Sequence, residues 1–354
     1  MYKHIDKIEK FDFNKKTVFI IMCAIIGSWA SISYINDLDF EHEDCMEFGH
    51  KGGSCTDYGM RLMYMINYDD HRFENPLRSV TFELLYYSKV IFDDYRIIPF
   101  ISSGFVLILT YLITQKLTNR YYTGIIAVLF VLHSPIFYKY DVTMTYPNFW
   151  VSFFLASIYF SLNAWALSPL MVALGMPSKI INILNFPATV IFGALADSDN
   201  KTKTITVHLS ILAILVSGLF ATKFVYPPIW NKVYSVFLSQ FNFQPMEFVW
   251  WLGMWAVELF TDKITLFMVY IMLMSLFLLR KQKVKNSSAL LAMIIIIILQ
   301  PAFISGFTEY TNEDYRFLHL VCFVGISLGF VVSNVRPLIN SFSTLLNGST
   351  ANKK

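Results

Sequence analysis

The sequence predicts an all-α, polytopic integral membrane protein with about ten transmembrane helices, and two observations support this prediction. Hydrophobic residues make up 55% of the 354 positions and charged residues only 15%, whereas a soluble domain carries roughly a quarter charged residues. Apolar stretches close to the roughly 20 residues that a helix needs to cross a bilayer recur from one end of the chain to the other. Because these stretches and their loops use the whole chain, we expect a single membrane domain over 1–354, embedded in the lipid bilayer.

The expected spans are apolar runs bounded by charged or turn-forming residues. The fifth and sixth are so close together that they would be short or re-entrant helices, joined by a turn at Gly175–Ser178. The first lacks a small-x-small cleavage site, so we favour a retained anchor over a cleavable signal peptide. In chain order the expected spans cover 17–35, 97–114, 121–137, 148–165, 166–176, 180–196, 205–223, 263–280, 287–304 and 317–334.

Basic residues form short clusters between alternate spans, and an even number of spans places every cluster on one side. The positive-inside rule assigns that side to the cytoplasm together with both termini, and we expect the membrane to be the plasma membrane. The loops at 37–96 and 225–262 are then extracytoplasmic. Clusters this short do not form a basic surface for nucleic acid, so no nucleic acid partner is expected. The residues of these clusters are Lys3, Lys7, Lys10, Lys15, Lys16, Lys116, Arg120, Lys201, Lys203, Arg280, Lys281, Lys283, Lys285, Arg336, Lys353 and Lys354.

The two long external loops have distinct compositions. The first contains thirteen Asp and Glu residues, and it also contains Cys45 and Cys55. In an oxidising exterior these cysteines would form a disulfide that closes a small Gly-rich loop. The alternative is a metal site with His42 and His50, although their spacing fits no familiar zinc pattern. In the second loop, the Trp-rich run 246–260 is too short to span comfortably, and we expect a helix lying in the interface plane.

Carboxylates at two external positions are candidates for catalysis. The string NDLDFEHED begins at Asn36, directly after the first expected span, and contains Asp37, Asp39 and Glu41. A carboxylate at a membrane surface can act as a general base on a hydroxyl or bind a divalent cation; the ordinary alternative is a solvated acidic loop. Asp141 is the only acidic residue in the very short loop between the third and fourth spans, and short loops place their side chains predictably.

Cationic residues at the outer ends of spans are candidates for phosphate binding. Arg316 follows Tyr315 at the start of the last span, Arg96 precedes the second span, and Lys223 closes the seventh. An Arg at this depth can simply extend its head to water. It can also bind phosphate oxygens with two parallel hydrogen bonds and a permanent charge.

Several function classes are disfavoured by the sequence. It contains no Walker pattern and no nucleophile elbow, which argues against nucleotide-driven transport and serine hydrolysis. Ionisable residues are nearly absent inside the expected spans, which counts against an ion-coupled transporter. A non-enzymatic polytopic protein, such as a transporter, a lipid flippase or a subunit of a membrane complex, stays the alternative to an enzyme.

The order of these parts resembles the GT-C superfamily of membrane glycosyltransferases, which includes the protein O-mannosyltransferases and the aminoarabinose transferases of lipid A. Both have a short basic N-terminus, one span, a large acidic external loop and a many-span body. The segment 95–150, from YRIIPF to TYPNFW, is similar to that family's Arg, apolar span, basic turn and second span ending in Ser-Pro. The string EDYRFL at 313–318 is similar to its Arg-Tyr element before a late span.

The resemblance implies a polyprenyl-phosphate sugar donor, an external active site, and a protein, glycan or lipid acceptor. By the same resemblance, Asp37 or Asp39 with its neighbour Glu41 matches the family's first-loop acid, Asp141 its second external carboxylate, and Arg316 its phosphate-side Arg. The chain departs from the family because it lacks the usual adjacent Asp-Glu pair in the first loop and a soluble C-terminal domain. A divalent cation (Mg or Mn) shared by Asp141 and a first-loop acid is left open.

Overall fold

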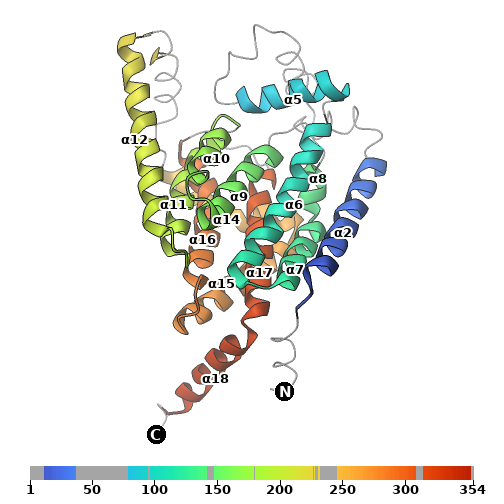
Figure 1. Cartoon of the computed structure of the whole chain (residues 1–354). Coiled ribbons are helices and arrows are strands. Elements are labelled where there is room, and N and C mark those ends of the chain that lie inside the picture. Colours follow the sequence, from blue (N-terminus) through green and yellow to red (C-terminus); the bar gives the residue numbers. More distant parts are fainter. Residues whose placement is uncertain are drawn as a thin grey trace.

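The computed structural model describes residues 12–36, 79–94, 96–141, 147–178, 180–225, 227, 230–231, 245–307 and 314–351. Every regular element within these ranges is a helix, and the helices pack into one bundle (Figure 1). The predicted all-α fold is therefore confirmed for the part of the chain that is described. Residues 37–78, which include Asp37, Asp39, Glu41, Cys45 and Cys55, lie outside it.

Each expected span coincides with a helix or with two helices separated by a break. The described helices are α2 (Lys15–Asn36), α5 (Ser79–Phe92), α6 (Ile97–Thr118), α7 (Tyr121–His133), α8 (Pro135–Tyr140), α9 (Pro147–Asn163), α10 (Ser168–Gly175), η2 (Ile180–Leu184), α11 (Asn185–Leu195), α12 (Lys201–Val225), α14 (Pro245–Glu258), η3 (Leu259–Thr261), α15 (Lys263–Lys281), α16 (Ser287–Phe307), η4 (Asp314–Phe317), α17 (Leu318–Ser333) and α18 (Val335–Ala351).

Helix length and composition identify four or five of the ten expected spans in the described part of the chain, and the others stay predictions. Among the described helices, only α2, α6, α12 and α15 are long and apolar enough to cross a bilayer, and the bent pair of α17 and α18 would make a fifth. Two of the others are short because the chain interrupts them: Pro135 has no amide hydrogen to continue α7, and α10 ends at Gly175. With its 8 residues, α10 rises only about 12 Å, far less than the roughly 30 Å of a hydrocarbon core.

The centre of the bundle is α17, which is buried on every side from Leu318 to Val331. Two glycines one turn apart let it approach the backbone of α7. A Cβ on Gly329 would lie 2.5 Å from the carbonyl oxygen of Thr123, and one on Gly325 would lie 2.8 Å from that of Ala127. Small residues four positions apart permit such backbone contact between helices in membranes.

The two ends of the bundle differ in charge and are named here accordingly. At the acidic-loop end, where α2 finishes and α6 begins, α5 lies across the helices (Figure 1). It is fixed there because Val80 N donates to the carbonyl oxygen of Pro177 (3.2 Å) and Thr81 Oγ1 donates to that of Ser178 (2.9 Å). The opposite, basic end contains the start of α2, the end of α15 and the ion pair of Lys285 with Asp197 (2.7 Å).

Three further helices lie against this body. α12 packs on α10 and α11 at one edge of the bundle (Figure 1). The expected helix within 246–260 is confirmed as α14, which packs along α16 with the rings of Phe248 and Phe303 5.3 Å apart; its position relative to the membrane interface stays a prediction. α18 turns by 79° from α17 and contacts α15, where Ser341 Oγ donates to the carbonyl oxygen of Leu278 (3.2 Å).

Candidate functional site

Asp141 connects three helices at the acidic-loop end. It ends α8 and is only 1% exposed. Its Oδ2 accepts hydrogen bonds from Trp29 Nε1 (2.8 Å) and Ser33 Oγ (2.5 Å) of α2, and its carbonyl oxygen accepts one from Ser103 Oγ of α6 (2.5 Å). Ser33 lies in the last turn of α2, four residues before Asp37 in the sequence.

Asp262 is a second buried carboxylate, and the sequence analysis did not single it out. It is 2% exposed and caps the N-terminus of α15, where its Oδ1 accepts from Thr265 N (2.9 Å). Its Oδ2 accepts from Thr265 Oγ1 (2.7 Å) and from Ser134 Oγ at the break between α7 and α8 (2.5 Å). An Asp directly before an apolar run, with Thr three residues later, is the capping signal that would have found it.

Arg316 lies between the segments that carry these two carboxylates. It belongs to η4, as Tyr315 does, and it is 8% exposed. η4 contacts α8, which ends at Asp141, and also η3, which ends directly before Asp262. A guanidinium buried this deeply is stable only beside anionic or polar groups, and Arg316 belongs to a segment packed against the two that carry the buried carboxylates.

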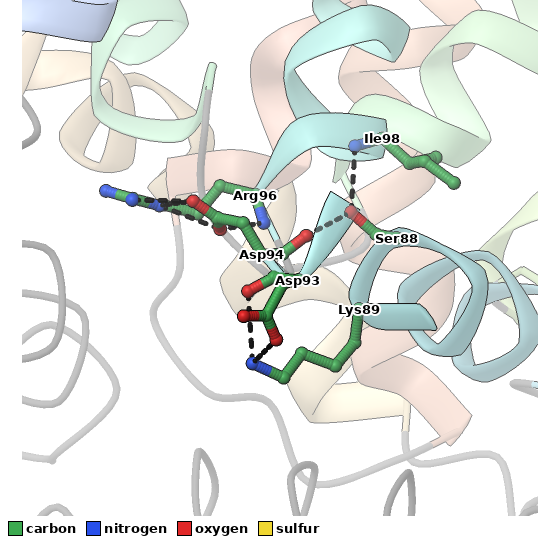
Figure 2. A network of polar contacts seen from close by, with 6 residues as sticks. All are labelled: Ser88, Lys89, Asp93, Asp94, Arg96 and Ile98. Atoms are coloured by element: carbon green, nitrogen blue, oxygen red, sulfur yellow. Dashed lines mark hydrogen bonds and ion pairs between the residues drawn. The ribbon is translucent and has the colours of Figure 1, made fainter. Parts of the chain in front are cut away.

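Arg96 has a different environment, which Figure 2 shows. Its guanidinium binds the carboxylate of Asp94, with Nη2 2.6 Å from Oδ2 and Nε 3.0 Å from both oxygens. Partial burial raises the pKa of Asp94, but the hydrogen bonds and charge of Arg96 and the charge of Lys89 lower it, so the pKa lies below its usual value. These contacts, with the Lys89–Asp93 ion pair (2.7 Å), make the turn between α5 and α6.

Lys223 is exposed near the end of α12, and its Nζ lies 5.9 Å from the ring centroid of Trp230. Figure 1 places α12 at the edge of the bundle away from α2 and α8. The structure therefore packs the segment of Arg316 against the helix that ends at Asp141. Arg96 instead pairs with Asp94 in the turn between α5 and α6, and Lys223 lies on α12 at the edge of the bundle.

A chain of buried polar side chains runs inward from the first turn of α17. His319 Nε2 lies 2.7 Å from Gln300 Oε1, and Gln300 Nε2 donates to Asn185 Oδ1 (2.8 Å). Asn185 Nδ2 then donates to Asn182 Oδ1, and Asn182 Nδ2 donates to the carbonyl oxygen of Gly175 (2.5 Å). All four side chains are at most 2% exposed.

The carbonyl at the end of this chain fixes its direction. Because Gly175 O can only accept, each amide must donate toward Gly175 and accept on its other side. Nε2 of neutral His319 therefore carries the hydrogen, and Nδ1 keeps its lone pair. The ring of Trp150 meets the His319 ring edge-on, with centroids 4.7 Å apart. Nδ1 of His319 and Nε1 of Trp150 are both buried, and neither has a hydrogen-bond partner in the described part of the chain.

A search of the spans for charged groups does not find this row of hydrogen-bonded side chains. Asn182, Asn185, Gln300 and His319 are neutral, yet each stands within an apolar run. Buried polar groups in membrane helices hydrogen-bond to one another across helices, so their positions alone are a usable signal. His319 follows Arg316 by three residues, so the row of polar side chains begins about one helical turn after Arg316.

The described residues do not form a set of ligands for a metal ion. No three His, Cys, Asp or Glu side chains come together within the described ranges. Asp141 is the one predicted ligand among them, and its Oδ2 already accepts two hydrogen bonds. Further ligands would have to come from outside the described residues, as the first-loop acids do.

Comparison with known proteins gives no information about the role of this site. No family model matches the chain, and neither the curated proteins nor the solved structures gave a significant match.

Proposed function

We propose that this chain is a membrane glycosyltransferase of the GT-C kind, which moves a sugar from a polyprenyl-phosphate donor to an acceptor on the extracytoplasmic side. The observation that carries the proposal is the position of η4. Arg316 lies on a segment packed against the one that ends at Asp141, and Asp141 is hydrogen-bonded to the last turns of α2, from which the acidic string emerges. Arg316 and Asp141 thus belong to the end of the bundle at which α2 finishes.

The roles follow from the charges that the reaction develops. The carboxylate of Asp37 or Asp39, with Glu41 as its neighbour, takes the proton of the acceptor hydroxyl as the hydroxyl oxygen forms a bond to the anomeric carbon. The bond between that carbon and the phosphate oxygen breaks, and the configuration inverts. The departing prenyl phosphate gains negative charge, which Arg316 stabilises more in the transition state than in the ground state. Asp141 holds the outer end of α2 and so positions the acidic string.

The buried ring pair adds a recognition element to this proposal. His319 Nδ1 can accept a hydrogen bond and Trp150 Nε1 can donate one, and a hydroxyl group satisfies both. A sugar carries several hydroxyls, and His319 lies one turn from Arg316. The pair is therefore suited to hold a sugar whose phosphate is bound at Arg316.

The membrane arrangement is part of the proposal. About ten segments enter the bilayer, with α7 and α8 as one interrupted span and α10, η2 and α11 as a re-entrant hairpin. The basic end faces the cytoplasm of a cell whose plasma membrane holds the protein, and the acidic-loop end faces outward, where a lipid-linked donor and its acceptor meet.

The test is transfer activity of the purified full-length protein in nanodiscs with radiolabelled polyprenyl-phosphate hexoses. We expect Arg316→Gln to lower the turnover about 10²- to 10³-fold, as the loss of one preorganised charge does in other enzymes. Asp37→Asn and Asp39→Asn are tested one at a time, and at least one should abolish transfer. The matched control is Asp93→Asn, because the Asp93 side chain is 92% exposed and its ion pair is with Lys89 in the turn between α5 and α6. Unchanged turnover in all three site variants would reject the assignment.

A transporter is the second candidate, and one observation favours it. The segment from α10 to α11 is interrupted, and the carbonyl of Gly175 and the side chains of Asn182 and Asn185 meet at the interruption. Broken helices with exposed carbonyls form substrate sites in many transporters. Proteoliposomes separate the candidates: uptake of a labelled solute that depends on Asn182, without sugar transfer, would favour the transporter.

A further inference from the structure

An open cavity of about 250 Å³ lies at the basic end of the bundle, between the last turn of α15 and α18. It is separate from the site described above, which is at the acidic-loop end. Five residues from the two helices line it: Leu278, Lys281, Gln282, Ser341 and Thr344.

The position of the cavity corresponds to the level of lipid headgroups. Lys281 is the last residue of α15, which is long and apolar enough to cross a bilayer. α18 starts directly after α17 and turns by 79° from it. A helix that turns through nearly a right angle at the end of a buried helix runs close to the membrane plane, as interfacial helices do. The cavity therefore opens where a span ends and a surface helix begins.

The lining offers a cation and a donor above an apolar floor. The hydroxyls of Ser341 and Thr344 already donate to the carbonyl oxygens of Leu278 and Asn340. The exposed ammonium of Lys281, which lies 4.8 Å from the ring centroid of Phe277, and the exposed amide of Gln282 are the groups that can donate to a ligand.

The excess of basic residues at this end of the bundle favours an anionic ligand. Among the described residues, eleven Lys and Arg belong to the basic end and only three acidic residues do. One of those acids, Asp197, is paired with Lys285. The eleven are Lys15, Lys16, Lys116, Arg120, Lys201, Lys203, Arg280, Lys281, Lys283, Lys285 and Arg336, and the three are Asp12, Asp197 and Asp199.

We propose that this cavity binds the phosphate of an anionic phospholipid from the leaflet at the basic end. The phosphate accepts from Lys281 and Gln282, and the glycerol and upper acyl carbons contact Leu278 and the side of α18. A free phosphate ion would use the same donors, but it would leave the apolar floor uncovered.

The experiment uses the full-length protein in phosphatidylcholine nanodiscs with or without phosphatidylglycerol, and native mass spectrometry counts the phosphatidylglycerol retained after extraction. We expect Lys281→Gln to retain it about fivefold more weakly, which is typical of one basic residue at an anionic membrane surface. Lys283→Gln is the matched control, because it removes the same charge two residues away, outside the cavity lining. Thermal melting in pure phosphatidylcholine shows whether both variants are folded.

Each other outcome overturns the proposal. Equal losses in the two variants would mean general attraction to a basic surface, and no loss in Lys281→Gln would mean that the cavity holds no such lipid. In phosphatidylcholine nanodiscs, stabilisation by inorganic phosphate as large as that by phosphatidylglycerol would assign the cavity to a free anion. None of these results depends on sugar transfer, so this proposal is tested independently of the proposed function.

Discussion

The contact between α17 and α7 leads to a quantitative prediction about Gly329. An added Cβ would lie 2.5 Å from the carbonyl oxygen of Thr123 and 2.6 Å from Cγ2 of Thr114. Both distances are well inside van der Waals contact, and the nearer atom belongs to a helix backbone that cannot turn aside. Gly329→Ala therefore forces the two helices apart at the most deeply buried part of the bundle.

The magnitude follows from two opposing effects. Overpacking of a well-packed core costs about 1–3 kcal/mol, and Ala gains up to about 1 kcal/mol over Gly in helix propensity. Because the obstacle is backbone, we expect the upper part of the first range and a net loss of about 2 kcal/mol. Gly27→Ala is the matched control: Gly27 is also within a helix, and nothing lies within 4 Å of its added Cβ. This control should be neutral or slightly stabilising.

The assay is reversible unfolding of the purified protein by SDS in mixed micelles, followed by circular dichroism and tryptophan fluorescence. Gly329→Ala should shift the midpoint to lower SDS, and Gly27→Ala should not. Equal midpoints for the two variants would show that α17 and α7 are not in backbone contact. The packing described for the centre of the bundle would then be wrong.

Three other perturbations give defined results. Gln300→Leu removes the hydrogen bonds of that amide to His319 and Asn185 and leaves both partners buried. Because two bonds are lost and each averages about 0.6 kcal/mol in membranes, SDS unfolding should show a free energy of unfolding lower by about 1–2 kcal/mol; an unchanged free energy would contradict this row of hydrogen bonds. Asp262→Ala removes the cap on Thr265 N and should cost about 1–2 kcal/mol in the same assay, whereas an unchanged midpoint would exclude the cap. The Asp94–Arg96 pair is partly exposed, so Arg96→Gln should cost only about 0.5–1 kcal/mol at pH 7. Because the folded-state pKa of Asp94 is lowered, that difference is complete above pH about 4 and should disappear as pH falls through the folded value; a difference that grows in acid would contradict the ion pair.

The positions of the helices could be predicted from the sequence, but not the way they divide. The runs at 17–35 and 97–114 became α2 and α6 with ends shifted by a few residues, because uninterrupted apolar runs specify helices well. Hydropathy predicts one span over 121–137, but Ser134-Pro135 breaks this run into α7 and α8. Apolar content predicts burial, whereas Pro and Gly decide continuity.

Hydropathy alone also missed the helices at the two surfaces. α5 lies in the acidic loop and α18 follows the last expected span, and neither is a long apolar run. Their positions depend on hydrogen bonds to distant turns, such as Thr81 with Ser178, which no local pattern contains. The Gly325-x-x-x-Gly329 spacing, by contrast, is visible in the sequence and is a known signal of close helix contact.

The candidate site was predictable where a loop was short. Asp141 was singled out because it is the lone acid of its loop, and the structure places its segment beside that of Arg316. Its link to Trp29 and Ser33 could not be predicted, because those partners are ordinary residues of an apolar run. Asp262 was missed, although an Asp directly before an apolar run is a helix-capping signal.

The bonds from Trp29 and Ser33 to Asp141 have a consequence for biosynthesis. The partners are separated by 112 and 108 positions in the sequence. At about 5–20 residues per second, the ribosome makes the carboxylate several seconds or more after the first helix has left the tunnel. During that interval the newly made α2 has its indole N–H and its hydroxyl in the membrane without their final acceptor. In nascent chains arrested before position 141, α2 should therefore not yet be fixed to the segment that ends at Asp141, whereas in chains arrested well after it α2 should be fixed there.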